Sequence, residues 1–323
     1  MAVKHLLGIR GLLRDEIYRY VNAAQSFVEV NEREIKKVPT LRGRTILNLF
    51  YEPSTRTLTS FDIAGKRLSA DTVNISVGNS SVKKGETLLD TARTLEAMNP
   101  DVLVVRHSES GVPHLLSKYL SRTAVINAGD GTHEHPTQAL LDLLTLKQHF
   151  DLSKRELEGL KIAIVGDVLH SRVARSNIWA HTALGNEVRL VGPATLVPER
   201  VLGEAGFGKN VSVHHKLASG IEGADVVLCL RMQLERQGEK FVPSLDEYCA
   251  DYCITERILS KHAPKAVVLH PGPMNRGIEI SSEVADGPRS LVARQVANGV
   301  ATRMAVLFEC ATSIKYQEEQ ADE

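Results

Sequence analysis

The sequence has few cysteines and no excess of charge of either sign, and both shortages exclude classes of protein. Its 323 residues include four cysteines, too few for the disulfide framework of a small secreted domain. Lysine plus arginine and aspartate plus glutamate number 39 each. That balance provides no overall field to draw the chain to nucleic acid or to an acidic membrane. We therefore expect no nucleic-acid partner and no membrane partner.

Long apolar runs are also missing. No segment approaches the roughly 20 apolar residues of a membrane-spanning helix. The first residues, MAVKHLLGIRGLLRDEI, hold no apolar stretch long enough for a signal peptide. The composition, with 43% hydrophobic and 24% charged residues, is that of an ordinary globular protein. We expect a cytoplasmic protein.

Motifs for a cofactor or a structural metal are scarce. The turn after the apolar run at 161–166 lacks the G-x-G-x-x-G spacing of a dinucleotide site, and no Walker lysine loop competes with the sites described below. Cys249 and Cys253 have no second pair of ligands nearby, so small buried thiols are expected there rather than a metal site. The sequence predicts no cofactor and no metal.

The chain does contain a regular alternation of two patterns. Short β-rich apolar runs recur between stretches with helical periodicity, which indicates parallel sheets covered by helices on both faces. The expected strands lie at 45–50, 72–77, 102–106 and 124–128, and then at 161–166, 187–192, 226–230 and 266–270. The predicted fold class is α/β, with two domains that each hold a helix-flanked parallel β-sheet.

The two groups of strands are separated by the helical stretch 137–150 and by the polar segment 151–159. A final helical stretch, 290–311, would pack back on the first domain, so that two interdomain helices join the halves of the chain. The expected domains are therefore 1–136 with 292–323, and 137–291.

The segment 50-FYEPSTRTLTSF-61 follows the first expected strand, where ligands of parallel sheets usually bind. Ser54 is a candidate N-cap, and the first helical turn carries Arg56 but no acid before Asp62. Free backbone N–H groups, hydroxyls and a guanidinium at a helix start favour an anion, phosphate above all. The alternative is a solvated helix start in which Arg56 pairs with Glu52.

Arginine also follows other strands, as Arg106, Arg172 and Arg231. Each could belong to a structural ion pair, but their repetition at the ligand edge of parallel sheets favours a site for more than one anionic group. The segment 267-VVLHPGPMNRG-277 ends a strand in a rigid Pro-Gly-Pro loop, which is suited to presenting backbone groups to a ligand.

The loop 128-AGDGTHEHPTQ-138 follows the fourth strand and runs into a long helix. His133, Glu134 and His135 could ligate zinc, but no other cluster of ligands with sensible spacing supports a metal. A single imidazole that donates to a substrate carbonyl fits this loop better.

The polar segment 79-NSSVKKGETLLDTAR-93 would, taken alone, be a surface loop.

Together these segments resemble the aspartate/ornithine carbamoyltransferase family over nearly the whole chain and in the family's order. The motifs that carry the resemblance are FYEPSTRT at 50–57, SSVKKGET at 80–87, Arg106-His107, GDGTHEHPTQ at 129–138, VGDVLHSR at 165–172, RMQLER at 231–236 and HPGPMNRG at 270–277. Each motif is moderately specific, and the ordered set is very specific.

The resemblance favours the aspartate branch over the ornithine branch. Ornithine enzymes typically carry a cysteine in the H-P-x-Q motif and an H-C-L-P loop, where this chain has His-Pro-Thr-Gln and His-Pro-Gly-Pro. The implied reaction transfers the carbamoyl group of carbamoyl phosphate to the α-amine of L-aspartate, an early step of de novo pyrimidine biosynthesis. Transfer to another amine, such as ornithine, is the alternative reaction. An anion-sensing or scaffolding protein without chemistry is the alternative from another class.

The resemblance also assigns residues. The carbamoyl phosphate-binding residues would be Ser54, Thr55, Arg56, Thr57, Ser80, Arg106, His135 and Gln138. The aspartate-binding residues would be Lys84, Arg172, Arg231, Gln233, Pro271 and Gly272. The residues that take part in the chemistry would be Arg56, Thr57, Lys84, Arg106 and His135.

Assembly is implied in the same way. Ser80 and Lys84 match loop residues that the family lends to a neighbouring subunit's site, so a homotrimer or a multiple of trimers is expected. Whether Ser80 or Ser81 reaches that site is open, and so is a dihydroorotase or regulatory-subunit partner.

Glu52 is expected to pair with Arg172 and Arg236 when substrates draw the domains together.

Overall fold

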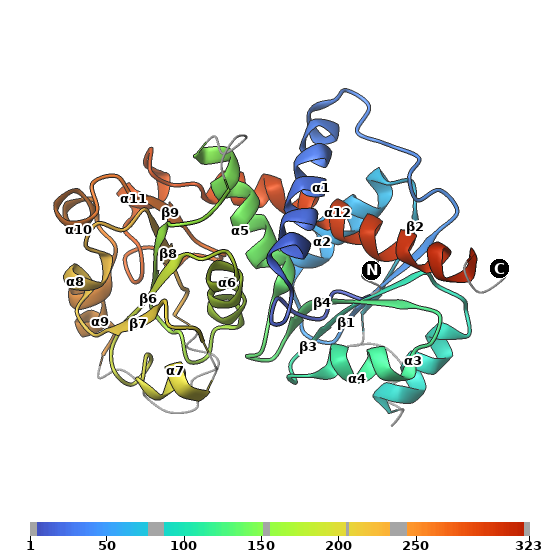
Figure 1. Ribbon diagram of the computed structural model, residues 1–323, viewed down its shortest axis with the longest axis horizontal. Helices are drawn as coiled ribbons and strands as arrows, with labels where there is room; N and C mark the ends of the chain where they lie inside the picture. The colour runs from blue at the N-terminus through green and yellow to red at the C-terminus, as the bar shows by residue number, and fades with distance from the viewer. Residues whose placement is uncertain (1–4, 77–86, 151–155, 205–206, 233–243, 320–323) are drawn as a thin grey trace. The chain divides into compact units, whose positions relative to one another are not determined.

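The computed structural model describes residues 5–76, 87–150, 156–204, 207–232 and 244–319, with side chains to residue 313. The chain forms two compact units, Met1–Leu144 with Ala297–Glu323 and Thr145–Val296. Figure 1 shows each unit as a sheet flanked by helices. The predicted fold class is therefore confirmed.

The first unit contains a four-stranded sheet in the order β2-β1-β3-β4, in which every pair is parallel. Its strands are β1 (Thr45–Phe50), β2 (Asp71–Ser76), β3 (Val102–His107) and β4 (Ala124–Asp130). Its helices are α1 (Arg14–Glu32), α2 (Thr55–Arg67), α3 (Leu88–Glu96) and α4 (Val112–Tyr119), with most of α5 (Pro136–His149) and α12 (Val292–Glu319).

The second unit contains a five-stranded parallel sheet in the order β7-β6-β5-β8-β9. Its strands are β5 (Lys161–Val165), β6 (Glu187–Val191), β7 (Val211–His214), β8 (Val226–Cys229) and β9 (Val267–Leu269). Its helices are α6 (Arg172–Ala183), α7 (Arg200–Glu204), α8 (Leu217–Ile221), α9 (Leu245–Tyr252), α10 (Glu256–His262) and α11 (Ser282–Asp286).

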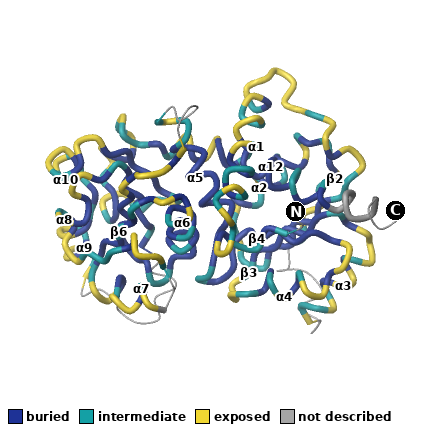
Figure 2. The backbone as a smooth tube through the Cα atoms, in the orientation of Figure 1, coloured by how far each residue is buried: buried dark blue, intermediate teal, exposed yellow. Residues whose placement is uncertain are grey.

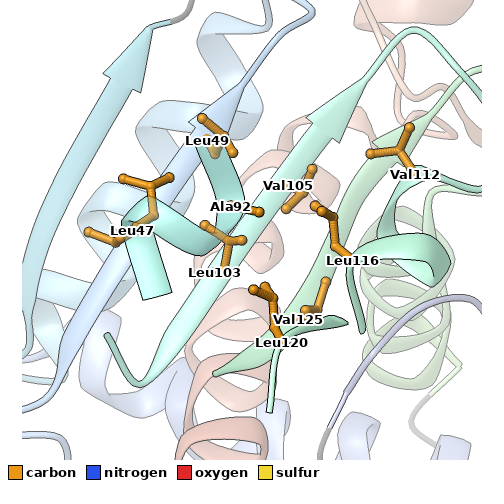
Figure 3. Close-up of a cluster of buried hydrophobic side chains, with 10 residues drawn as sticks. Leu47, Leu49, Ala92, Leu103, Val105, Val112, Leu116, Leu120 and Val125 are labelled. Atoms are coloured by element: carbon orange, nitrogen blue, oxygen red, sulfur yellow. The ribbon is translucent and has the colours of Figure 1, made fainter. Parts of the chain in front are cut away.

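The strands read as continuous apolar runs because both faces of each sheet are covered. Figure 2 shows the sheets as buried backbone beneath more exposed helices. On one face of the first sheet, side chains of β1, β3 and β4 pack against α3 and α4 (Figure 3). This cluster comprises Leu47, Leu49, Ala92, Leu95, Leu103, Val105, Val112, Leu116, Leu120 and Val125. It fixes the carboxyl ends of β1, β3 and β4, from which the candidate site is built.

The eight strands predicted from the sequence are present, each within two residues of its expected bounds. Strand β7 was not predicted. This strand lies at the edge of the sheet, and three of its four residues, 211-VSVH-214, are half-buried. Its sequence alternates apolar and polar residues, so it lacks the apolar run by which the other strands were predicted.

Candidate active site

The turn from β1 into α2 presents a helix start with no acid in its first turn. Ser54 is the N-cap residue, but its side chain does not cap a backbone N–H. Its Oγ instead donates to Oγ1 of the buried Thr57 at 3.0 Å. Thr55 and Arg56 are exposed beside it. Lys66 and Arg67 lie in the last turn, where cations complement the negative end of the helix dipole. Arg56 lies at the positive end, where the dipole favours an anion rather than a cation.

Arg106 lies at the carboxyl end of the neighbouring strand β3 and is 7% exposed. Its Nη2 donates to Oε1 of Glu52 at 2.7 Å, and its Nη1 donates to the carbonyl of Ala128 at 3.1 Å. These two bonds fix the plane of the guanidinium at the sheet edge. The structure therefore gives Glu52 a partner other than Arg56.

His135 and Gln138 are buried at the start of α5, after the adjacent strand β4. The Gln138 backbone N–H donates to the carbonyl of His135 at 3.0 Å. The Gln138 side chain donates from Nε2 to Oδ1 of the buried Asp142 at 2.9 Å. Because Nε2 faces Asp142, Oε1 is the end of this amide that is suited to accept a hydrogen bond from a ligand N–H.

Asp130 organises the loop that carries His135. This fully buried carboxylate accepts from the backbone N–H of Gly111 at 2.7 Å and of Glu134 at 3.1 Å, and from Asn127 Nδ2 at 2.8 Å. Burial alone would raise its pKa, but hydrogen bonds from His133, Gly111 and Asn127 lower the pKa below the ordinary value. Asp130 is thus an ionised structural anchor.

A close approach between two loops requires glycine at position 131. Gly131 has φ +48, and a Cβ there would lie 2.8 Å from Ser110 N and 2.9 Å from Ser108 O. Any larger residue would push apart the turns that follow β3 and β4. This is the physical reason for the second glycine of the Gly-Asp-Gly motif.

Zinc at His133, Glu134 and His135, the alternative considered from the sequence, is not assembled. The Glu134 carboxylate is buried and accepts from the backbone N–H groups of Ile9 at 2.7 Å and Arg10 at 3.1 Å. Glu134 therefore ties this loop to the N-terminal segment. Among the described residues, the group with ligand atoms close enough for one ion contains His133 but neither Glu134 nor His135.

Arg303, on α12, was missed in the sequence because it follows no strand. It is 5% exposed, and its guanidinium carbon lies 5.3 Å from the centre of the Phe61 ring on α2. Nη1 donates to the carbonyl of Gly299 at 3.1 Å, and Nε has no hydrogen-bond partner among the described residues. Burial, and then the charges of Arg106 and Arg56, lower its pKa to about 9. Arg303 therefore adds positive charge behind the α2 helix start.

The second unit places Arg172, which is 5% exposed, at the first residue of α6. The N-cap residue Ser171 accepts from the backbone N–H of Ala174 at 3.1 Å. Before it, the buried Asp167 accepts from the backbone N–H of His170 at 3.2 Å. Arg231 is half-buried just after β8. Both arginines thus follow strands that are neighbours in this sheet.

The loop after β9 contains Pro271 and Gly272, and the side chain of His270 stabilises its backbone. The Gly272 backbone N–H donates to Nδ1 of His270 at 2.8 Å, which requires Nδ1 to be the unprotonated nitrogen. The other nitrogen, Nε2, lies 3.1 Å from Oε1 of the buried Glu279. This chain of contacts fixes the backbone groups of the loop.

Three of the sequence-predicted site residues are not among those described. Ser80, Lys84 and Gln233 lie outside the described residues, as does the alternative Ser81. The same holds for Arg236, the second expected partner of Glu52.

Within the described part of the chain, no helix is both long enough and apolar enough to span a membrane.

Two family models together match most of the chain. Residues 4–148 match the model described as aspartate/ornithine carbamoyltransferase, carbamoyl-P binding domain. Residues 158–310 match its Asp/Orn binding domain. The chain belongs to the aspartate/ornithine carbamoyltransferase family.

Relatives within this family are similar over almost their whole length. The aspartate carbamoyltransferase catalytic subunit of Magnetococcus marinus is 56% identical over 311 residues, which cover 96% of this chain and 93% of that one. The corresponding subunit of Syntrophotalea carbinolica is 55% identical over 307 residues, 94% of each chain.

Solved structures of carbamoyltransferases share the fold. The catalytic subunit of M. jannaschii aspartate transcarbamoylase has a TM-score of 0.82 and 32% identity, covering 96% of this chain and 99% of that one. Aspartate transcarbamoylase from Trypanosoma cruzi, in complex with carbamoyl phosphate and aspartate, has a TM-score of 0.82 and 31% identity, with coverage of 95% and 96%. Ornithine carbamoyltransferase from Pyrococcus furiosus has a TM-score of 0.81 and 26% identity, with the same coverage.

Proposed function

We propose that this protein is an aspartate carbamoyltransferase, which converts carbamoyl phosphate and L-aspartate to N-carbamoyl-L-aspartate and phosphate. The observation that carries the proposal is the set of groups at the carboxyl edge of the first sheet. Arg56, Thr57, Arg106, His135 and Gln138 follow β1, β3 and β4, which are consecutive in that sheet. The Magnetococcus and Syntrophotalea relatives named above support aspartate as the acceptor.

In this proposal the phosphate of carbamoyl phosphate binds at the start of α2. The backbone N–H groups and the hydroxyls of Ser54, Thr55 and Thr57 donate to its oxygens, and Arg56 supplies the opposite charge. Arg106, oriented by Glu52, lies between the phosphate and the carbamoyl group. Ser80, from a neighbouring subunit, completes the phosphate-binding set.

The carbamoyl group is recognised by its two ends. Thr57, Arg106 and His135 donate to the carbonyl oxygen, while Gln138 Oε1 accepts from the carbamoyl NH₂ group. When the aspartate amine attacks the carbonyl carbon, negative charge develops on the carbonyl oxygen, so the same donors stabilise the tetrahedral intermediate.

The C–O bond to phosphate then breaks, and phosphate leaves with the electron pair. Arg56 and Lys84 stabilise the charge that develops on it. A phosphate oxygen takes the proton lost by the attacking amine, so the mechanism requires no side-chain general base. Positioning and fixed donors supply most of the acceleration.

Aspartate is assigned to the second unit. Arg172, Arg231 and Gln233 bind its two carboxylates with Lys84, because guanidinium groups match carboxylates in a bidentate manner. The backbone of Pro271 and Gly272 supplies further contacts. We assign residues 1–136 with 292–323 to carbamoyl phosphate binding and 137–291 to aspartate binding.

The proposal includes an assembly and a cellular role. Because Ser80 and Lys84 would act in a neighbouring site, the active form is a homotrimer or a multiple of trimers. The reaction belongs to de novo pyrimidine biosynthesis in the cytoplasm.

The experiment that tests the proposal offers aspartate, ornithine and putrescine in parallel to the purified protein with carbamoyl phosphate. We expect carbamoyl product with aspartate alone. Product with ornithine instead would reassign the acceptor. Binding of phosphate without product from any amine would favour an anion sensor.

A further inference from the structure

A second cluster of ligand-type side chains lies beside the site but takes no part in the proposed reaction. His114 belongs to α4, Asp130 ends β4, and His133 lies in the turn before α5. One ligand atom from each residue can be chosen so that all three lie within 4.8 Å of one another. The three residues come from separate elements, so tertiary structure assembles the cluster.

The distances within the cluster approach those of a coordination sphere. His133 Nδ1 lies 3.0 Å from Asp130 Oδ2. Two ligands of one ion, each about 2.1 Å from it, are separated by about 3.0–3.4 Å. The rings of His114 and His133 meet edge to face, with centroids 5.5 Å apart. Small side-chain rotations of His114 would therefore bring all three ligands onto one ion.

Two features indicate that the cluster is prepared for a ligand. Nδ1 of His114 is buried and has no hydrogen-bond partner among the described residues, which is costly for a polar atom. The second feature is the Asp130 carboxylate, which is fully buried and whose Oδ2 faces His133 Nδ1.

We propose that His114, Asp130 and His133 bind a divalent transition-metal ion of the zinc type, with water completing the coordination. Two imidazoles and one carboxylate form a common zinc ligand set. The ion would take the place of the proton between His133 Nδ1 and Asp130 Oδ2, and the neutral imidazole would then carry its one proton on Nε2. The His133 side chain is 33% exposed, which leaves a route for entry of the ion and for the water ligand.

The site would act as a clamp on the loop that carries His135. It joins α4 to the turn two residues before His135, so an ion would add a cross-link between the elements that follow β3 and β4. No step of the proposed reaction passes through it, and its existence does not depend on the proposed function.

Metal binding is measured directly on the full-length protein after removal of any histidine tag. We expect equilibrium dialysis against Zn²⁺ to show one ion per chain, and Co²⁺ to give visible d–d bands of a nitrogen- and oxygen-ligated ion. His114→Gln and His133→Gln should each raise the dissociation constant at least about tenfold, the smallest loss expected even for supporting residues of metal sites. Asp130 is left intact because its hydrogen bonds hold the loop.

Controls separate this cluster from other ligands. His149→Gln removes an exposed histidine of the second unit, outside the cluster, and should leave the affinity unchanged. A Cys249→Ser, Cys253→Ser background removes the partly exposed thiols, and Co²⁺ bands should persist in it. Folding of each variant is checked by circular dichroism. Absence of a stoichiometric ion, or equal affinity in the two histidine variants and the parent protein, would overturn the proposal.

Discussion

Arg106 and Glu52 form an ion pair at the carboxyl edge of the first sheet, with 2.7 Å between Nη2 and Oε1. The two side chains are 9% and 21% exposed, so solvent screens the pair only partly. Glu52 thus orients the arginine that the proposed mechanism places on the carbonyl oxygen. The predicted pairing of Glu52 with Arg172 and Arg236 during closure stays a prediction.

Glu52→Gln removes the charge but keeps the shape of this side chain. We expect inorganic phosphate to inhibit the variant more strongly, because a negative charge beside the anion site is lost. Turnover should fall, because Arg106 is no longer held in one orientation. Steady-state kinetics with phosphate as inhibitor measure both effects, and exposed Glu199→Gln is the control. Unchanged phosphate inhibition together with unchanged turnover would contradict this role.

Arg56→Ala removes the only cation in the first turn of α2. We expect turnover to fall by at least about 10²-fold, the scale for losing one fixed donor to developing charge. Thr59→Ala, an exposed change on the same helix, should have little effect. Near-normal turnover in a folded Arg56→Ala protein would remove Arg56 from the mechanism.

Arg303→Met replaces a buried cation with an apolar side chain of similar length. Because the described residues offer Arg303 no carboxylate partner, we expect the free protein to melt at a higher temperature. Added phosphate should raise the melting temperature less than it does in the parent protein, because part of the attraction for the anion is lost. Thermal denaturation with and without phosphate measures both shifts. Exposed Arg257→Met should change neither, and an equal phosphate effect in both proteins would refute the coupling.

Mixing two inactive proteins tests the shared site. If each site joins Arg56 of one chain to Lys84 of its neighbour, a mixed trimer of Lys84→Ala and Arg56→Ala chains collects both defects in one site and leaves another site with both residues intact. Mixed trimers should therefore recover part of the activity after subunit exchange by mild denaturation and refolding. Exchange confirmed by mass tags without recovery would place Lys84 in its own chain's site.

His181 makes the stability of the second unit depend on pH. It is 1% exposed, and burial lowers its pKa from 6.5 to about 4. Between these values the unfolded chain binds more protons than the folded one. Stability is therefore fully present above pH 6.5 and is lost as the pH falls toward about 4, by up to about 1.4 kcal/mol per pH unit.

Urea denaturation at several pH values, followed by the fluorescence of the single tryptophan Trp179 in the same helix, measures this slope. His181→Gln should reduce it. His262 provides the comparison, because its side chain is 18% exposed rather than fully buried, so His262→Gln should change the slope less than His181→Gln does. A slope that persists in His181→Gln would assign the pH dependence to other groups.

The sequence was most informative where a local pattern decides the structure. The β1–α2 turn, Arg106 after β3 and the loop before α5 are each set by an apolar run followed by polar residues. Contacts between distant residues were not predictable in this way. Glu134 binds the backbone of Ile9, 125 residues away, and Arg303 meets Phe61 across two helices. The spacing of apolar and polar residues along the sequence does not predict such pairs, because only the tertiary fold brings them together.

The first unit is discontinuous, and this has a consequence for the order of folding during synthesis. Its C-terminal part, Ala297–Glu323, is synthesised after the whole of the second unit, Thr145–Val296, which is continuous. The second unit can therefore complete its core while the first still lacks α12 and the cation Arg303. Because domains generally fold as units during synthesis, the split first unit has to wait for its final segment. A nascent chain would complete its first unit, with the anion site, only after the second unit has been synthesised.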